Sequence, residues 1–384
     1  MRTFKMLLLS LLLLFVSALV TGCWNYRELD QMAVVAGVAI DKGIHEKYSI
    51  TVEIVEITTG KESQTKSQTI TIEGKTIFDA VRHSISLIGR RIYWSHAKVV
   101  IISREIAEEG VVQVLDWFNR DAETRADIHI LVSKGESAKE ILAAKSPTEE
   151  VTSFVLDEII TNQRSLSNAP HIEIWKFTNI LVSKGVGSIA TAIDLRPENN
   201  QKLPHIMGTA VFKDDSLLGF IDGEQTKDML FIQNQIKGGI LVAEENNKEG
   251  ISQVSLEIFN SKTKIKPVVN NGNIEFNVKI ETNVAIDEIG GVANVIEDTG
   301  RKRLEESAEK SLKYRLENII RKVQEEYGVD IFGFGAKLRE EKPKAWNTVS
   351  DNWGDVFKTL KVNVEAKVHI KNSAMLSKPL EIGD

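Results

Sequence analysis

The stretch ISQVSLEIFNSKTKIKPVVNNGNIEFNVKIETNVAIDEIG, residues 251–290, decides the fold class of the C-terminal half. Apolar and polar side chains alternate on both sides of Asn271-Gly272, a dipeptide typical of a two-residue hairpin turn. Alternation with period two predicts strands that bury one face and expose the other. Such strands belong to antiparallel sheets with one solvated side, so we expect a hairpin within such a sheet. Leu360–Ile370 repeats the alternation and predicts a further strand.

One long charged helix is predicted between these strands, at roughly Gly300–Tyr327. Its apolar residues recur at helical spacing and form one stripe: Leu304, Ala308, Leu312, Leu316, Ile319, Ile320 and Val323. Glu and Lys fill the opposite face, as is typical of a solvated surface. We therefore predict an α+β fold in which a C-terminal antiparallel sheet is crossed by the long helix.

The N-terminal half mixes strands and helices. Met32–Ile40 and Tyr48–Ile57 have strand patterns, and the apolar run Val99–Ile102 fits a strand that is buried on both faces. Thr76 and Asp79 resemble a capping box at the start of a helix. The apolar stripe of that helix is predicted at Phe78, Val81, Ile85 and Ile88. This half is therefore predicted to be an α/β domain.

A change in composition predicts the main domain boundary. Arg196–Pro204 reads RPENNQKLP, a polar segment with a proline near each end. The predicted division is an N-terminal α/β domain at residues 23–196 and a C-terminal α+β domain at residues 204–384. A further subdivision of the second domain near Asn294 stays open.

Cys23 is the only cysteine in the 384 residues, and its surroundings predict a lipoprotein. Arg2 and Lys5 precede an apolar run from Met6 to Val20, and small residues then lead to Gly22-Cys23. This pattern predicts that residues 1–22 are a signal peptide cleaved between Gly22 and Cys23, whose thiol carries the diacylglycerol. The alternative is an uncleaved anchor helix with an incidental cysteine. An apolar run of 15 residues is shorter than the roughly 20 that span a bilayer core.

The charge balance argues against a nucleic-acid partner. The chain has 48 basic and 54 acidic residues, and removal of Arg2 and Lys5 with the signal peptide leaves 46 basic residues. An acidic mature chain does not favour binding to nucleic acid. It also does not favour binding to anionic lipid through a polybasic segment. Once Cys23 is acylated, no thiol remains for disulfides, thiolate catalysis or cysteine metal sites.

Histidine spacing gives no sign of a metal site. No two of the seven histidines have i, i+4 spacing, and none lies in an HExxH pattern. His83 and His369 are typical of surface or hydrogen-bonded histidines. We therefore predict no metal and no cofactor.

Other candidate motifs have simpler structural explanations. Turn geometry explains Gly185-Val-Gly187 and Gly333-Phe-Gly335, and Asp214-Asp215 fits a turn between two strands. Trp346 and Trp353 are predicted core residues. Because no nucleophile–base pattern is present, we predict that the protein is not an enzyme.

Three segments resemble the Ger(x)C family of lipoproteins, the C subunits of spore germinant receptors. GCWNYRELD, Gly22–Asp30, is similar to the family's GCWxxREL opening, and AVVAGVAIDK, Ala33–Lys42, resembles its usual continuation. The second segment is Gly208–Leu241. The third is DIFGFG, Asp330–Gly335, with Pro343, Trp346 and Trp353 after it. Because the three segments span both halves, the resemblance covers essentially the whole mature chain.

The resemblance implies a lipoprotein that is anchored, through acylated Cys23, on the outer face of the inner spore membrane. It implies action with an A-type subunit and a transporter-like, integral B-type subunit in germination triggered by small nutrients. An α+β fold with mixed sheets in about three domains is implied as well. The resemblance assigns no catalytic or nutrient-binding residue in this chain. The only functional residue that it assigns is the acylated Cys23.

Two other functions are weighed against this non-enzymatic receptor subunit. A solute-binding lipoprotein of a transport system usually has repeated β–α alternation and parallel sheets around a cleft, whereas Ile251–Ile286 indicates antiparallel pairing. A cell-envelope hydrolase would need a nucleophile–base pair or a metal cluster, and neither is apparent in the sequence.

Overall fold

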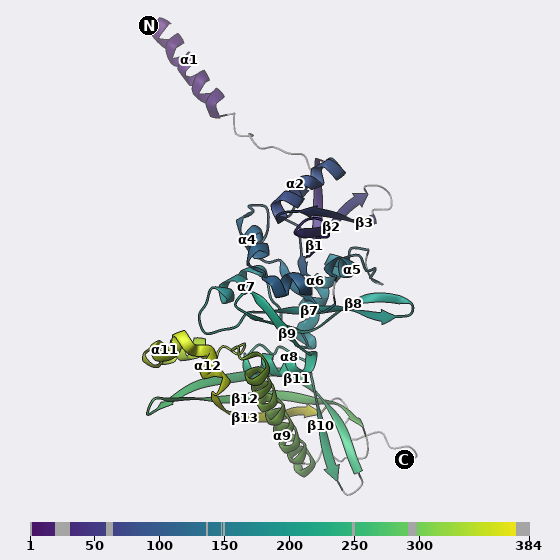
Figure 1. The fold of residues 1–384 in the computed structure, drawn as a ribbon, viewed down its shortest axis with the longest axis vertical. Coiled ribbons are helices and arrows are strands. Elements are labelled where there is room, and N and C mark those ends of the chain that lie inside the picture. Colours follow the sequence, from purple (N-terminus) through teal and green to yellow (C-terminus); the bar gives the residue numbers. More distant parts are fainter. Residues whose placement is uncertain are drawn as a thin grey trace.

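The protein is built on two β-sheets with helices packed around them (Figure 1). The structure is a computed structural model that describes residues 2–19, 31–58, 64–135, 137–146, 148, 150–247, 250–290 and 298–373. The fold class is confirmed: both sheets combine with helices in an α+β arrangement, and a long helix lies along the second sheet.

The first sheet has nine strands and a parallel centre. The strands are β1 (Met32–Lys42), β2 (Tyr48–Thr58), β3 (Gln64–Gly74), β4 (Arg91–Tyr93), β5 (Val99–Ile102), β6 (His129–Ser133), β7 (Ile189–Glu198), β8 (Gln201–Lys213) and β9 (Ser216–Ile221). Their order is β3-β2-β1-β5-β6-β7-β8-β9, with β4 beside β1. Strands β1, β5, β6 and β7 run parallel, whereas β2, β3, β8 and β9 pair antiparallel.

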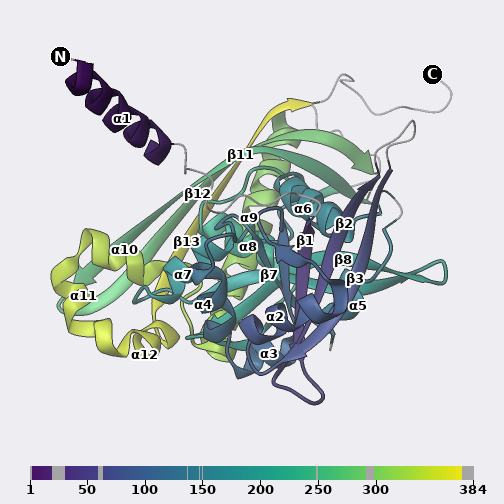
Figure 2. The same cartoon turned by 90° about the horizontal axis from the view of Figure 1, so that it is seen from above.

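Helices cover both faces of this first sheet (Figure 2). They are α2 (Ile77–Ile88), α3 (Arg104–Glu109), α4 (Val112–Arg120), α5 (Ala138–Leu142), α6 (Thr152–Asn162), η2 (Gln163–Ser165), α7 (Ile174–Leu181) and α8 (Gly223–Ile232). Val99 and Ile101 of β5 join the core cluster under α5 and α6, whereas Val100 and Ile102 join the main cluster. Burial on both faces, predicted for this strand, is confirmed.

The predicted apolar stripe of α2 is wrong in part. Thr76 caps the helix as expected, accepting a hydrogen bond from the backbone N–H of Asp79. The fully buried positions are Ile77, Ala80 and Ser84, while Phe78 is 49% exposed and Ile85 is 41% exposed. Small side chains face the sheet because the helix packs closely on it: a Cβ on Gly74 would lie 2.8 Å from the Cβ of Ala80.

The segment Arg196–Pro204 is the tip of a β-hairpin in the first sheet. Strands β7 and β8 pair from Ile189↔Val211 out to Glu198↔Gln201. Asn199 and Asn200 both have positive φ, as a two-residue type I′ turn requires. The first sheet thus continues through β9, beyond the predicted boundary, because polar turn residues close a hairpin as readily as they link domains. The division into domains at residues 23–196 and 204–384 stays a proposal.

The second sheet has the order β10-β11-β12-β13. Its strands are β10 (Ile240–Asn247), β11 (Gly250–Asn270), β12 (Asn273–Gly290) and β13 (Lys361–Ser373). The predicted hairpin is confirmed, with Asn271 and Gly272 at positive φ between β11 and β12. One pairing differs from the prediction: β13 runs parallel to β12. The helices between the two strands form the crossover connection that parallel pairing needs.

A group of helices lies between β12 and β13 in the chain. They are α9 (Asp298–Lys322), the π-helical turn η3 (Val323–Tyr327), α10 (Phe334–Glu341), α11 (Pro343–Val349), η4 (Ser350–Asn352) and α12 (Trp353–Lys358). Every residue of the predicted stripe of α9 is buried. The polar side of α9 also contacts the sheet edges: Glu305 accepts a hydrogen bond from Ile370 N of β13, and Ser307 donates one to Glu244 O of β10.

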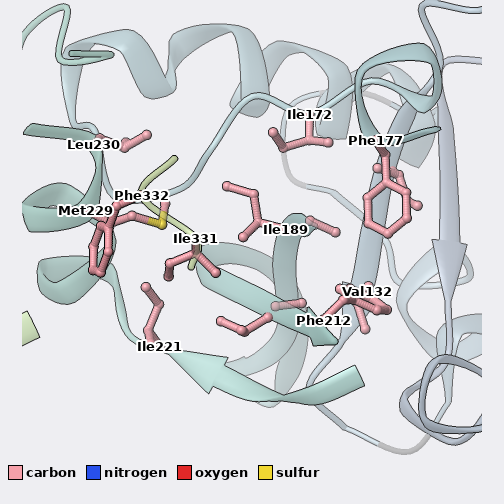
Figure 3. Close-up of a cluster of buried hydrophobic side chains, with 14 of the residues drawn as sticks. Val132, Ile172, Phe177, Ile189, Phe212, Ile221, Met229, Leu230, Ile331 and Phe332 are labelled. Atoms are coloured by element: carbon pink, nitrogen blue, oxygen red, sulfur yellow. The ribbon is translucent and has the colours of Figure 1, made fainter. Parts of the chain in front are cut away.

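The main apolar core cluster runs from the first sheet into the second. Figure 3 shows Val132, Ile189 and Phe212 of the first sheet approaching Met229 of α8 and Ile331 of the C-terminal half. Helix α8 lies at the centre of this core, and Met229 to Ile232 are all at most 5% exposed. The two sheets are thus joined by packed side chains as well as by the polypeptide backbone.

The N-terminal helix α1 (Arg2–Leu19) is not part of this core. Its large apolar side chains from Phe4 to Phe15 that the structure describes are 62% to 72% exposed. Among the helices in the described ranges, none has both the length and the apolar character that a membrane crossing requires.

Candidate functional site

The residues predicted to be modified, Gly22 and Cys23, lie outside the described residues. Polar side chains converge at several places in the described part of the chain. Two of them lie in the second and third segments that resemble the Ger(x)C family, and two are cavities beside α6 and α7.

Asp330 organises the third of those segments. Its buried carboxylate accepts hydrogen bonds from the backbone N–H groups of Phe332, Gly333 and Gly335 and from Trp353 Nε1, at 2.7 to 3.2 Å. Burial raises the pKa of Asp330 to about 6, although the backbone donors, Gly335 first, favour the charged form. All four donors come from the protein itself, so this carboxylate fixes the start of α10 and the position of Trp353.

The two glycine fragments noted in the sequence meet at this place. Gly187 N donates to Asp330 O at 2.8 Å, and a Cβ on Gly335 would lie 2.4 Å from Gly185 O. Gly185 has φ +86°, and its missing side chain makes room for the ring of Trp346. Turn geometry therefore explains these glycines only in part, because close packing also leaves no room for a side chain at Gly185 and Gly335. We call this contact of 185–187 with 330–335, Trp346 and Trp353 the glycine junction.

The second segment holds α8 against α9 through a balanced group of charges. Asp228 accepts two hydrogen bonds from the guanidinium of Arg315, at 2.6 and 3.2 Å. The buried ammonium of Lys227 lies 3.0 Å from Glu224 and also donates to Ile240 O. Burial raises the pKa of Asp228 against the opposing pull of Arg315. Two cations face two carboxylates here, which is the arrangement of a structural network.

A cavity of about 340 Å³ contains a histidine pair that the sequence did not reveal. The rings of His129 and His171 are perpendicular with centroids 4.6 Å apart, and His129 Nε2 lies 3.0 Å from Asp157. The hydrogen bond from His129 lowers the pKa of Asp157, and burial lowers the pKa of His171. These residues are far apart in the chain, so no local spacing could have predicted the contact.

His129 lacks the geometry of a general base in this cavity. His129 Nε2 is engaged by Asp157, and its Nδ1 is buried without a hydrogen-bond partner among the described residues. A base must reach the proton that it abstracts, so a nitrogen closed off from the cavity cannot act on a bound substrate. Within the described part of the chain, no group of three or more His, Cys, Asp or Glu residues could hold a metal ion.

A larger cavity of about 650 Å³ lies beside η2, where the first half of the molecule meets residues 233–239. These residues connect α8 to β10 and are hereafter the connector. Arg164, Lys176 and Lys237 line this joint cavity together with His171. No carboxylate is found among the described residues that line it. Its chemistry is therefore cationic, in contrast to the balanced charges between α8 and α9.

Two family models match the chain. The model for the spore germination protein N-terminal domain matches residues 25–195, and the model described as spore germination B3/GerAC like, C-terminal, matches residues 207–374. The chain is 24% identical to spore germination protein B3 of Bacillus subtilis (strain 168), over 93% of this chain and 95% of that protein. It is 22% identical to spore germination protein KC of the same organism, over 97% of both chains.

A solved structure has the same fold. The crystal structure of the GerBC protein matches with a TM-score of 0.58 and 22% identity, over 88% of this chain and 97% of that chain. The α+β architecture, with its two sheets and long helix, is thus that of spore germination proteins of the C type. This chain belongs to the Ger(x)C family of spore germination proteins, and this membership supports a role in spore germination.

Proposed function

We propose that the protein is a non-enzymatic, membrane-tethered subunit of a nutrient germinant receptor. The observation that carries this proposal is the match of two germination-protein models to successive parts of one chain, at residues 25–195 and 207–374. The polar clusters of the second and third family-like segments support a non-enzymatic role, because their donors and acceptors engage one another.

The proposed tether is the acylated Cys23. The exposed apolar helix α1 supports removal of residues 1–22, since a segment with no place in the core can be cleaved without loss of packing. Cys23 would then be the first residue of the mature protein and carry the diacylglycerol and further palmitate-type chains. Two or more acyl chains are needed for stable attachment, since one chain binds a membrane only marginally.

The short tether would also orient the molecule. Eight residues lead from Cys23 to Gln31, a reach of about 28 Å when fully extended. The following residue, Met32, pairs with Arg91 of β4 just past the end of α2. The end of the first sheet that holds β4 and α2 would therefore face the bilayer, on the outer face of the inner spore membrane. The second sheet would lie farther out, accessible to the proposed partners, which are an A-type and a transporter-like B-type subunit.

Germination of mutant spores tests the proposal. Spores that lack the protein and spores with Cys23→Ala are exposed to separate nutrients, and the loss of optical density is followed. We expect deletion to abolish the response to one class of nutrient and Cys23→Ala to weaken that response. A trigger that acts without receptors is the control, and membrane fractionation checks that the Cys23→Ala protein is made but released. Normal responses of both strains to every nutrient would contradict the proposal.

A solute-binding lipoprotein of a transport system is the second candidate. The joint cavity favours it, because its volume of about 650 Å³ is that of a small-molecule site. Loss of uptake of one solute in the deletion strain, with unchanged germination, would support this alternative over the receptor subunit.

A further inference from the structure

We propose that the joint cavity is a binding site for a small organic anion that also carries a hydrogen-bond donor. Such a site goes beyond the germination role, because it means that this chain itself binds a small molecule. It stands on three features of the cavity, which are its unbalanced charge, its apolar lining and a buried acceptor without a partner.

The charge of the cavity comes from Arg164, Lys176 and Lys237, hereafter the cationic set. Arg164 Nε donates to Thr161 O at 3.2 Å, and Lys176 Nζ donates to His171 O at 3.4 Å. None of the three forms an ion pair with a carboxylate of the described residues, although lysines elsewhere, such as Lys98 with Asp157, do so. Burial lowers the pKa of Lys176, and the nearby carboxylate of Glu173 offsets only part of this desolvation. An anion held there would supply the missing charge.

The apolar lining indicates an organic anion. Ile160, Ala169 and Leu230, hereafter the apolar set, line the same cavity. Ala169 and Leu230 are at most 5% exposed, and Ile160 is 1% exposed. A volume of about 650 Å³ lies within the range of roughly 300 to 1,000 Å³ typical of small-molecule sites. Inorganic phosphate would fill little of it and leave the apolar set without a contact.

The third feature is Gln163, which lines the cavity and is 5% exposed. Its Oε1 is buried and has no hydrogen-bond partner in the described part of the chain. Buried polar atoms are nearly always paired in folded proteins, and each unpaired one costs about 1 to 3 kcal/mol. If the flexible side chain of Gln163 turned toward the cavity, a ligand with an ammonium or hydroxyl group beside its anionic group would supply this donor.

The position of the cavity gives such a ligand two halves of the molecule to contact. Ser167 Oγ donates to Gly238 O at 2.8 Å, so the loop after η2 is already bound to the connector. A Cβ on Gly238 would lie 2.8 Å from Arg164 O, which shows how closely the two segments pack. The cationic set spans the same contact, since Lys237 belongs to the connector and Arg164 to η2. Binding would therefore tie the connector, and with it the start of β10, to the first half.

Isothermal titration of the full-length chain in detergent, with four probes, tests the proposal. L-leucine has the anion, the donor and the apolar group; 4-methylpentanoate lacks the donor; L-leucinamide lacks the anion; inorganic phosphate lacks the apolar group. We expect leucine to bind most tightly and 4-methylpentanoate to bind more weakly. Leucinamide and phosphate should bind at least tenfold more weakly than leucine, because each lacks a whole class of contact.

A matched pair of variants locates the site. Lys176→Gln with Lys237→Gln should weaken leucine binding at least tenfold, whereas Lys264→Gln with Lys266→Gln, on the exposed face of β11, should leave it unchanged. Lys237→Gln alone, at an exposed residue, serves if the double variant does not fold. The proposal is overturned if no anion binds, if leucinamide or phosphate binds as tightly as leucine, or if binding survives both substitutions. None of these results bears on germination. The proposed receptor role is tested separately, by the germination of mutant spores.

Discussion

The glycine junction and the joint cavity both connect the two halves of the molecule, yet their chemistry is opposite. At the glycine junction, Asp330 accepts four hydrogen bonds and Gly185 leaves no room for a side chain beside Trp346. At the joint cavity, no residue of the cationic set forms an ion pair with a carboxylate of the described residues, and Gln163 Oε1 has no hydrogen-bond partner among them. Satisfied polar groups in a tight contact indicate architecture, while unsatisfied ones around a cavity indicate a place for another molecule.

The largest effect is expected at the centre of the glycine junction. Asp330→Ala would leave three backbone N–H groups and Trp353 Nε1 without their acceptor, and we expect a loss of about 4 kcal/mol in the free energy of unfolding. Urea unfolding of the full-length chain measures it. Asp351→Ala is the control, since the side chain of Asp351 is 90% exposed and should contribute less than about 0.5 kcal/mol. Equal stability of the two variants would mean that the junction is not architectural.

A glycine substitution separates backbone strain from close packing. In Gly185→Ala the new Cβ would lie 2.4 Å from Trp346 at a residue with φ +86°, so we expect a loss of about 3 kcal/mol. Gly89→Ala has φ +65° and no atom within 4 Å of the new Cβ, so strain alone should cost about 1 kcal/mol. Thermal unfolding of both variants gives the difference, and a Gly89→Ala cost as large as that of Gly185→Ala would remove the packing argument.

The raised pKa of Asp330 predicts a pH dependence of stability. With a pKa of about 6 in the folded state against an ordinary value of 3.8, the folded protein binds a proton between these values that the unfolded chain releases. The free energy of unfolding, relative to Asp330→Asn, should therefore fall as pH rises from about 4 to about 6, by up to about 3 kcal/mol. Urea unfolding at several pH values tests this, and a difference that rises with pH would show that the four donors outweigh burial.

The smallest effect on stability is expected at the joint cavity. Lys176→Met removes a partly buried charge that forms no ion pair within the described residues and whose burial outweighs the attraction of Glu173, so stability should stay the same or rise by about 0.5 kcal/mol. Lys98→Met is the matched control, because its ammonium lies 3.2 Å from Asp157, and it should lose up to about 1 kcal/mol. Chemical unfolding of both variants decides the point. A large loss for Lys176→Met would make this lysine a structural residue.

Local periodicity in the sequence predicted those elements whose burial follows a simple repeat. The hairpin around Asn271-Gly272 and the stripe of α9 are confirmed because each element has one buried face and one polar face. Trp346 and Trp353 are buried as predicted, with ring centroids 5.6 Å apart. Family membership was also recognisable, because its segments combine turn glycines and buried aromatic residues at fixed spacing.

Local sequence patterns could not predict contacts between segments that are far apart in the chain. The alternation in Leu360–Ile370 is the same for either strand direction, so it could not show that β13 runs parallel to β12. The polar segment Arg196–Pro204 gave no sign that its flanks pair with each other. The stripe of α2 was misplaced because Ala80 and Ser84, and not the large apolar residues, allow close approach to the sheet. The residues of the joint cavity converge from α6, α7, α8 and the connector, which no local spacing records.

The parallel pairing of β12 and β13 has a consequence for the order of folding. Lys361 of β13 lies beside Glu275 of β12, 86 residues earlier in the chain. During synthesis, the chain makes α9 to α12 before it makes β13. One row of backbone N–H and C=O groups of β12 therefore stays unpaired until β13 has been made. Contacts of such large sequence separation slow folding, and an open strand edge invites pairing with another chain. Until the last strand docks, this edge of the second sheet is thus open to pairing with another chain.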